Sequence, residues 1–216
     1  MTLVCTPLMA QTPNYHLSVT TEEYPPFNDQ VDGVIVGEAT AQLVWAFEQA
    51  GVDANFQLLP WARAYTETRF RRDHCVYPTT RTPKRELMFR WAGPLAVDEW
   101  AVLTIESSTV APTHLKELAG LRVGSFHEDA IGDYVESFGI DVIRAPSMRV
   151  NMARLEAGAL DVIVTGRATA ELIATEENTT LRHLFTFAYM PLYLACHPSV
   201  PHHVMKRVQR ALETAP

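Results

Sequence analysis

A strand–helix–strand–helix–strand pattern occurs twice along the chain, and it constrains the fold more than any other feature of the sequence. In the first copy, strand-like and helical runs alternate at 16–22, 38–50, 55–59, 60–72 and 75–78. The second copy repeats this alternation at 121–126, 129–138, 140–144, 147–158 and 160–165. Such alternation predicts a parallel sheet covered by helices. We therefore expect an α/β protein with two lobes, each with a sheet of its own.

The helical runs also carry start and stop signals. Gly51 follows the run at 38–50 as a stop signal, and Asp129 and Ser147 stand where the N-caps of two later helices are expected. Apolar residues at helical spacing predict a buried face in the first of these helices, made of Leu43, Val44, Phe47 and Ala50.

Two apolar runs, 97–105 and 184–196, connect the two halves of the chain. Because the chain crosses between the halves twice, we expect a hinge of two strands. A final amphipathic run at 201–214 predicts a last helix. The expected boundaries are 14–97 plus 198–216 for lobe one, and 100–188 for lobe two.

Four polar segments follow the carboxyl ends of the expected strands. They are 22–27 and 79–81 in the first half, and 127–129 and 166–167 in the second. Ligands of open parallel α/β sheets bind beyond the carboxyl ends of the strands. If the lobes face each other, these four segments line one cleft.

Arginine dominates the positive charge in and near these segments, since only three of the 18 basic residues of the chain are lysines. A guanidinium group can bind a carboxylate through two parallel hydrogen bonds, which favours an anionic group on the ligand. Any one of these arginines could equally be a solvated surface residue. The candidates are Arg63, Arg81, Arg85 and Arg167.

Aromatic and acidic side chains complete the expected cleft. Tyr24 and Trp61 could provide aromatic walls, although Trp61 could instead pack in the core. The carboxylates of Glu22, Glu23, Glu128 and Asp129 could hold an ammonium group. For Asp129, the alternative is a structural role as a helix cap.

The composition argues against several other classes of function. A net charge of −7 leaves no broad basic face for nucleic acid. The sequence contains no GxGxxG, GxxxxGK[ST], HExxH or GxSxG motif, so we expect no cofactor and no common catalytic centre. Although the triplet 127–129 contains metal-ligand residue types, adjacent side chains seldom all point at one ion, and we expect no metal.

The three cysteines and the first residues of the chain concern its compartment. Cys75 and Cys196 lie in apolar strand-like runs, where they could be two buried thiols or a disulfide, and Cys5 lies near the start. Residues 1–10 are apolar and end in Ala10, before a polar stretch. We interpret 1–10 as the remnant of a secretory signal, although the basic start of such a signal is missing. Export to the periplasm is therefore expected.

These segments resemble the family 3 extracellular solute-binding proteins, of the polar amino-acid type, over residues 15–213. The segments 21–27, 80–86, 115–124 and 155–161 carry the resemblance, and 60–64 looks like a variant seen in one branch of the family. The resemblance implies a type II periplasmic-binding fold. It also implies that Arg85 grips the α-carboxylate of the ligand and that Thr80 offers its hydroxyl and main chain nearby.

Two positions depart from the family pattern. Asp129 stands where the family often has serine or threonine, and an acid there would repel a carboxylate. The aspartate that binds the ammonium group in the family would fall near Gly166, where this chain has no acid. An ordinary α-amino acid is therefore a doubtful ligand.

The expected function is capture of a small charged solute by hinge closure and delivery to an ABC permease, by a protein that acts as a monomer. Two alternatives remain. One is a dehydratase-like enzyme with Glu23 or Asp129 as its acid or base, and the other is a sensory ligand-binding domain. The candidate binding residues are Glu23, Tyr24, Trp61, Arg63, Thr80, Arg81, Arg85, His127, Asp129 and Arg167.

Overall fold

The computed structural model describes residues 15–215. Eight strands form the main sheet: β1 (Tyr15–Thr21), β4 (Val52–Leu58), β5 (His74–Thr80), β6 (Arg90–Ile105), β7 (Val123–Phe126), β8 (Val142–Ala145), β9 (Val162–Gly166) and β10 (Leu181–Cys196). A separate hairpin consists of β2 (Asp29–Val31) and β3 (Val34–Val36). The helices are α1 (Glu38–Ala50), α2 (Trp61–Phe70), α3 (Ala130–Glu136), α4 (Met148–Glu156), α5 (Arg167–Glu176) and α6 (His202–Leu212).

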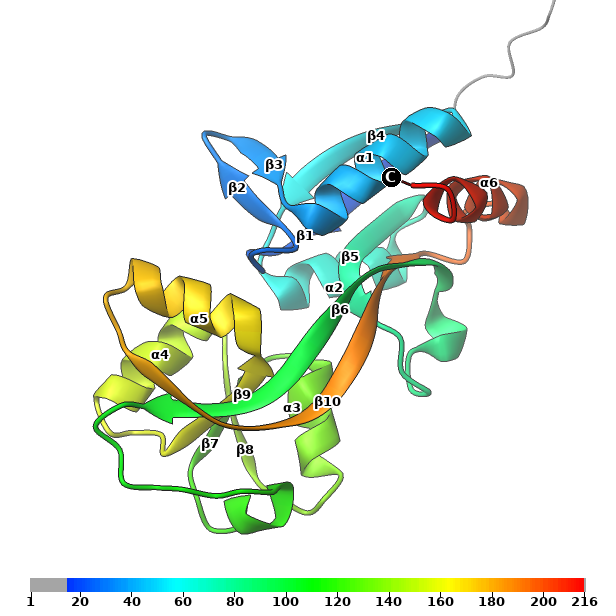
Figure 1. The fold of residues 1–216 in the computed structure, drawn as a ribbon. Helices are drawn as coiled ribbons and strands as arrows, with labels where there is room; N and C mark the ends of the chain where they lie inside the picture. Colours follow the sequence, from blue (N-terminus) through cyan, green and yellow to red (C-terminus); the bar gives the residue numbers. More distant parts are fainter. Residues whose placement is uncertain (1–14, 216) are drawn as a thin grey trace, which may run out of the picture.

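The elements are arranged in two lobes, which β6 and β10 join (Figure 1). In lobe one, β1 pairs in parallel with β4 and β5, and in lobe two β7 pairs in parallel with β8 and β9. This confirms the predicted class, α/β with two lobes and a two-strand connection. The residue boundaries of the lobes stay a prediction, and the predicted signal remnant at 1–10 lies outside the described residues.

The expectation of a separate sheet in each lobe is wrong. The strand order is β4-β1-β5-β10-β6-β9-β7-β8, so one hydrogen-bonded sheet continues through both lobes. The reason is the length of β6 and β10, which have 16 residues each and pair antiparallel from one lobe into the other. β5 then adds to β10 in lobe one, and β9 adds to β6 in lobe two.

Helix α1 shows how the core of lobe one forms. Leu43 and Phe47 are buried against the sheet, and Gly51 ends the helix with a φ of 59° that suits glycine. The prediction for Val44 is wrong, because its side chain is 41% exposed. The buried face is centred on the stripe 39, 43, 46, 47 and 50, and Val44 lies at its edge.

The two predicted N-caps of lobe two are confirmed. The Asp129 carboxylate accepts a hydrogen bond from the Ile131 N–H at 3.0 Å at the start of α3. The Ser147 hydroxyl accepts one from the Val150 N–H at 3.5 Å at the start of α4. These caps fix the segments that precede both helices, and those segments face lobe one.

The structure decides between the two alternatives for the cysteines, because Cys75 and Cys196 form a disulfide. They are paired residues of β5 and β10, and both are fully buried. The bond therefore ties the lobe-one end of a connecting strand to the central strand of that lobe. Among residues 15–215, no helix is long and apolar enough to cross a bilayer.

We expect loss of this disulfide to destabilise the protein. It closes a loop of 121 residues, and cross-links over loops of that size stabilise proteins by about 2–5 kcal/mol, mainly by restricting the unfolded chain. The double variant Cys75→Ala/Cys196→Ala should lower the free energy of unfolding by that amount in urea titrations. Dithiothreitol should lower the free energy of unfolding of the wild type by the same amount and should leave that of the variant unchanged. Equal midpoints for the reduced and oxidised wild type would contradict the expectation.

Candidate ligand-binding site

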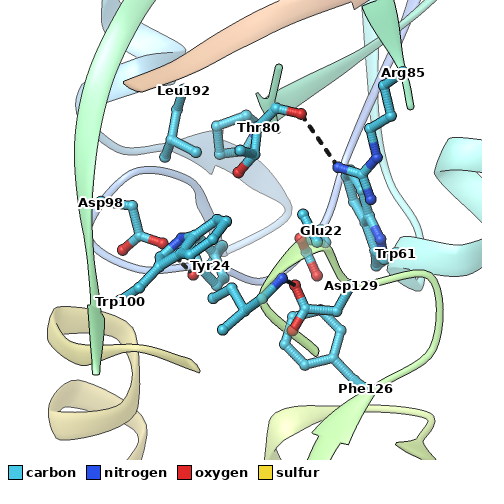
Figure 2. A pocket seen from close by; sticks show the side chains of 13 residues that line it. Glu22, Tyr24, Trp61, Thr80, Arg85, Asp98, Trp100, Phe126, Asp129 and Leu192 are labelled. Atoms are coloured by element: carbon cyan, nitrogen blue, oxygen red, sulfur yellow. Dashed lines mark hydrogen bonds between the residues drawn. The ribbon is translucent and has the colours of Figure 1, made fainter. Parts of the chain in front are cut away.

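A cavity lies between the two lobes, at the carboxyl ends of the strands (Figure 2). Its volume is about 20 Å³, which is room for about one water molecule. The residues that line it are Glu22, Tyr24, Trp61, Pro78, Thr80, Arg85, Asp98, Trp100, Phe126, Asp129, Ala130, Ile131 and Leu192.

A second cavity of about 300 Å³ lies beside the first and shares four of its wall residues, Glu22, Tyr24, Trp61 and Phe126. It continues along the cleft to the start of α4, where Ser147 and Arg149 contribute to its wall. The two cavities together therefore form one elongated cleft between the lobes, with a narrow and a wide end.

Arg85 lies at the narrow end and is only 4% exposed. Its Nη1 donates to the Thr80 carbonyl at 3.3 Å, and its Nη2 donates across the cleft to the Glu128 carbonyl at 2.5 Å. Its guanidinium lies over the rings of Tyr65 and Trp61, at 4.8 and 5.5 Å from their centres. Since a guanidinium has five N–H donors, donors remain for an anionic group.

The Glu128 carbonyl is the point where lobe two meets lobe one. It also accepts a hydrogen bond from the Trp61 indole Nε1 at 3.0 Å. Glu128 has a φ of 59°, a left-handed conformation that is unfavourable for a residue other than glycine. The turn before α3 is thus held in a strained shape that directs this carbonyl at Trp61 and Arg85.

Three carboxyl groups surround the same cavity: those of Glu22, Asp98 and Asp129. Burial raises the pKa of Asp98 to about 7, and the Asp129 carboxyl adds to the rise while a hydrogen bond from Tyr24 opposes it. Burial also raises the pKa of Asp129, and burial together with Asp129 holds the pKa of Glu22 well above its usual range. The narrow end therefore contains three carboxyl groups with raised pKa values, and Arg85 is the cation in its wall.

Asp98 interacts with several donors, since hydrogen bonding from Tyr24, the Trp100 indole and the Glu99 backbone N–H all lower its pKa. Its Oδ2 accepts a hydrogen bond of 2.8 Å from the Tyr24 hydroxyl, whereas Oδ1 lacks a hydrogen bond of ordinary geometry although the residue is 1% exposed. The Tyr24–Asp98 pair packs against the backbone of Gly166. A Cβ at Gly166 would lie 2.2 Å from the Tyr24 hydroxyl and 2.6 Å from Asp98 Oδ1, so no side chain fits there.

Ion pairs close the cleft at both ends. The Arg149 guanidinium of α4 pairs with Glu23 of lobe one and with Glu176 and Glu177 of α5. On the other side, Lys84 Nζ lies 2.8 Å from a carboxylate oxygen of Asp133 in α3. The lobes are thus in contact around the cleft, as in a closed form.

Comparison with solved structures identifies the fold. The arginine-bound form of a truncated ArgBP from T. maritima superposes with a TM-score of 0.81 at 17% identity, over 92% of this chain and 95% of that chain. ArtJ, an arginine-, lysine-, histidine-binding protein from Geobacillus stearothermophilus, superposes with a TM-score of 0.80 at 19% identity, over 91% of this chain and 87% of that chain. A histidine kinase sensor domain with similarity to periplasmic binding proteins superposes with a TM-score of 0.84 at 19% identity, over 93% of this chain and 90% of that chain.

The chain has the fold of the periplasmic binding proteins. No family model and no curated protein sequence matches it. The type II fold that the sequence resemblance implies is therefore confirmed by three-dimensional structure.

The structure brings six of the ten predicted binding residues to the cleft. The first cavity is lined by Tyr24, Trp61, Thr80, Arg85 and Asp129, and the second by Glu23. Asp129 combines its cap with this position, since Ser125 donates to its other oxygen at 2.5 Å. Whether these residues bind a ligand stays a prediction.

The other four predicted residues line neither cavity, and whether they contact a solute stays a prediction. Arg63 is bound to Glu67, and Arg81 is bound to Glu86 and lies over two rings of lobe one. Arg167 pairs with Glu171 and Glu99. His127 follows β7 and donates its backbone N–H to the Ala145 carbonyl of β8, and the residue is exposed. In residues 15–215 no three metal-ligand side chains are grouped to hold an ion.

Sequence reasoning missed the contribution of the connecting strand β6. Asp98 and Trp100 both line the first cavity, but the run 97–105 was interpreted only as a hinge. The available signal was the acidic pair Asp98 and Glu99 within an otherwise apolar run, since a buried carboxyl is rare without a partner.

We expect the Asp98 carboxyl to make folding stability depend on pH. Its pKa is about 7 in the folded protein and about 3.9 in an unfolded chain. The folded state therefore binds the extra proton, and stability falls as pH rises from about 4 to 7. Asp98→Asn should become more stable relative to the wild type by about 2 kcal/mol or more between pH 5 and pH 8.

Chemical denaturation of both proteins at the two pH values measures this difference. Asp141→Asn is the control, because Asp141 is exposed and its removal should give the same difference at both pH values. A difference between Asp98→Asn and the wild type that does not change with pH would show that the carboxyl is ionised at pH 5.

Proposed function

We propose that the protein is a solute-binding protein of the periplasm, which closes its lobes on a small charged solute and presents it to an ABC permease. The single observation that supports this best is the position of Arg85. It lies in the cleft between the lobes, it contacts both of them, and it keeps donors for an anionic group. A carboxylate on the solute would be bound there, and the protein would act as a monomer.

The disulfide and the fold support the proposed compartment. Disulfides such as Cys75–Cys196 persist in oxidising compartments, of which the bacterial periplasm is one. Two of the neighbours named above are an arginine-bound ArgBP and an arginine-, lysine-, histidine-binding protein, so an amino acid or a related compound is the proposed solute.

A sensory role is the second candidate, because one neighbour of equal similarity is the sensor domain of a histidine kinase. Both roles use the same closure. Native mass spectrometry of freshly purified protein should reveal a bound small molecule with a carboxylate. Its release unchanged after incubation supports binding, and its conversion to a product would support the dehydratase-like alternative.

Arg85→Ala should weaken binding of L-arginine, the probe suggested by the neighbours, by at least about tenfold. The variant loses a charge-assisted hydrogen bond to the solute and the Arg85–Glu128 contact across the cleft. Arg85→Lys should also bind more weakly, because lysine lacks the planar fork. Calorimetry gives the affinities, and thermal melts report folding.

Arg63→Ala is the matched control, since Arg63 is another arginine of lobe one but is 61% exposed and outside the cleft. It should bind as the wild type does. Unchanged affinity in a folded Arg85→Ala variant would remove Arg85 from the site.

Closure itself is testable through Lys84, which joins the lobes but lines neither cavity. Exposed ion pairs contribute up to about 1 kcal/mol, so Lys84→Ala should weaken solute binding about two- to fivefold by favouring an open form. Small-angle scattering should show a larger radius of gyration for the solute-free variant than for Lys206→Ala, whose lysine is exposed on α6. Identical scattering profiles would contradict closure through this pair.

A further inference from the structure

Asp98 Oδ1 and Trp100 Nε1 are two buried polar atoms in the wall of the narrow cavity that lack a hydrogen bond of ordinary geometry. Asp98 is only 1% exposed. Buried polar atoms are nearly always bonded, and an unbonded one is strongly unfavourable. A donor that enters this cavity would therefore be bound at Oδ1.

The hydroxyl of Tyr24 holds the carboxyl in this orientation. It donates to Oδ2, while Oδ1 lies toward Gly166, and Figure 2 shows Asp98 facing Tyr24 beside Trp100. Gly166 makes the arrangement possible, because any side chain at 166 would occupy the space of Tyr24 and Asp98. The acid and the glycine are thus linked by packing.

The charge around the cavity points to a cationic ligand group. Glu22, Asp98 and Asp129 line it, and Arg85 is the cation in its wall. The rings of Tyr24, Trp61, Trp100 and Phe126 also line it, and aromatic faces attract cations. A solute with a carboxylate alone could bind Arg85 but would face three acids. A solute that carries both a carboxylate and an ammonium or guanidinium group could bind Arg85 with the first and the acids with the second.

We propose that Asp98, on the connecting strand β6, is the principal acid of a cation subsite, which Glu22 and Asp129 complete and which Tyr24 orients. This deepens the proposed function and rests on it. The solute then carries a carboxylate for Arg85 and at least one ammonium or guanidinium group for Asp98. Because β6 joins the lobes, the cation is bound by the strand on which the lobes turn.

The test compares probes that differ in charge, by calorimetry and by the fluorescence of Trp61 and Trp100 in the cavity wall. The probes are L-arginine, L-glutamine and succinate, the last of which has carboxylates and no cation. The wild type should bind L-arginine best and succinate least. Asp98→Asn should weaken L-arginine at least about tenfold, as expected for loss of a charged partner in a buried site.

A second readout separates binding from a structural role. Asp98 faces Glu22, Tyr24, Asp129 and Arg85, and a cation that binds there should displace protons from the acids. The binding enthalpy of the wild type near pH 6.5 should therefore depend on the ionisation enthalpy of the buffer, and that dependence should decrease in Asp98→Asn. Asp141→Asn should retain it.

Tyr24→Phe keeps the ring but removes the hydrogen bond that orients Asp98. It should weaken the binding of L-arginine less than Asp98→Asn does. Equal binding of L-arginine by the wild type and Asp98→Asn would overturn the cation subsite and leave solute binding intact. Binding of succinate without binding of either amino acid would do the same. If no probe binds and no small molecule is released from the purified protein, the proposed function fails, and the subsite with it.

Discussion

The antiparallel pairing of β6 with β10 is the constraint on which the rest of the molecule depends. These two strands carry one sheet through both lobes, and they are the only covalent connections between the lobes in residues 15–215. Every contact across the cleft, from Arg85–Glu128 to Lys84–Asp133, forms only because this pair holds the lobes face to face. The disulfide at Cys196 fixes the lobe-one end of the same pair.

Much of the fold follows from local patterns. The expected helix at 38–50 matches α1 at both ends, because its apolar spacing and the glycine after it act within a few residues. The hairpin of β2 and β3 was missed although its turn is readable. Asp32 and Gly33 both have positive φ, and Asp-Gly between Val31 and Val34 is a strong hairpin signal. The continuous sheet was not predictable, since it depends on pairing between residues of β6 and β10 that are 76 to 106 positions apart, from Leu181↔Ile105 to Cys196↔Arg90.

The residues of the candidate site also differ in whether local sequence patterns predict them. Tyr24, Trp61, Thr80, Arg85 and Asp129 follow strands or begin helices, where the rule of strand ends applies. Asp98 lies inside a strand, so the face to which it points depends on register. β10 shifts register against β6 three times, and simple alternation cannot be counted through such irregularities. The sequence pattern of β6 could therefore not place Asp98 in the cavity.

The four arginines show which local signal would have separated binding candidates from surface residues. Arg63 and Arg167 each have a glutamate four residues later, and Arg81 has one five residues later, and each is bound to that glutamate. Arg85 has no acid at such a spacing, because Arg81 and Phe89 stand four residues before and after it. Its charge is instead met by carbonyl oxygens and two rings, which leaves its charge without an acidic side chain bound to it. Arg85 also lies close enough to Glu22 and Asp129 to lower their pKa, so the cation and the carboxyls of this cavity already interact in the closed form. Under the proposed function, one solute that carries both charges would add a partner for Arg85 and a partner for the carboxyls when the lobes close.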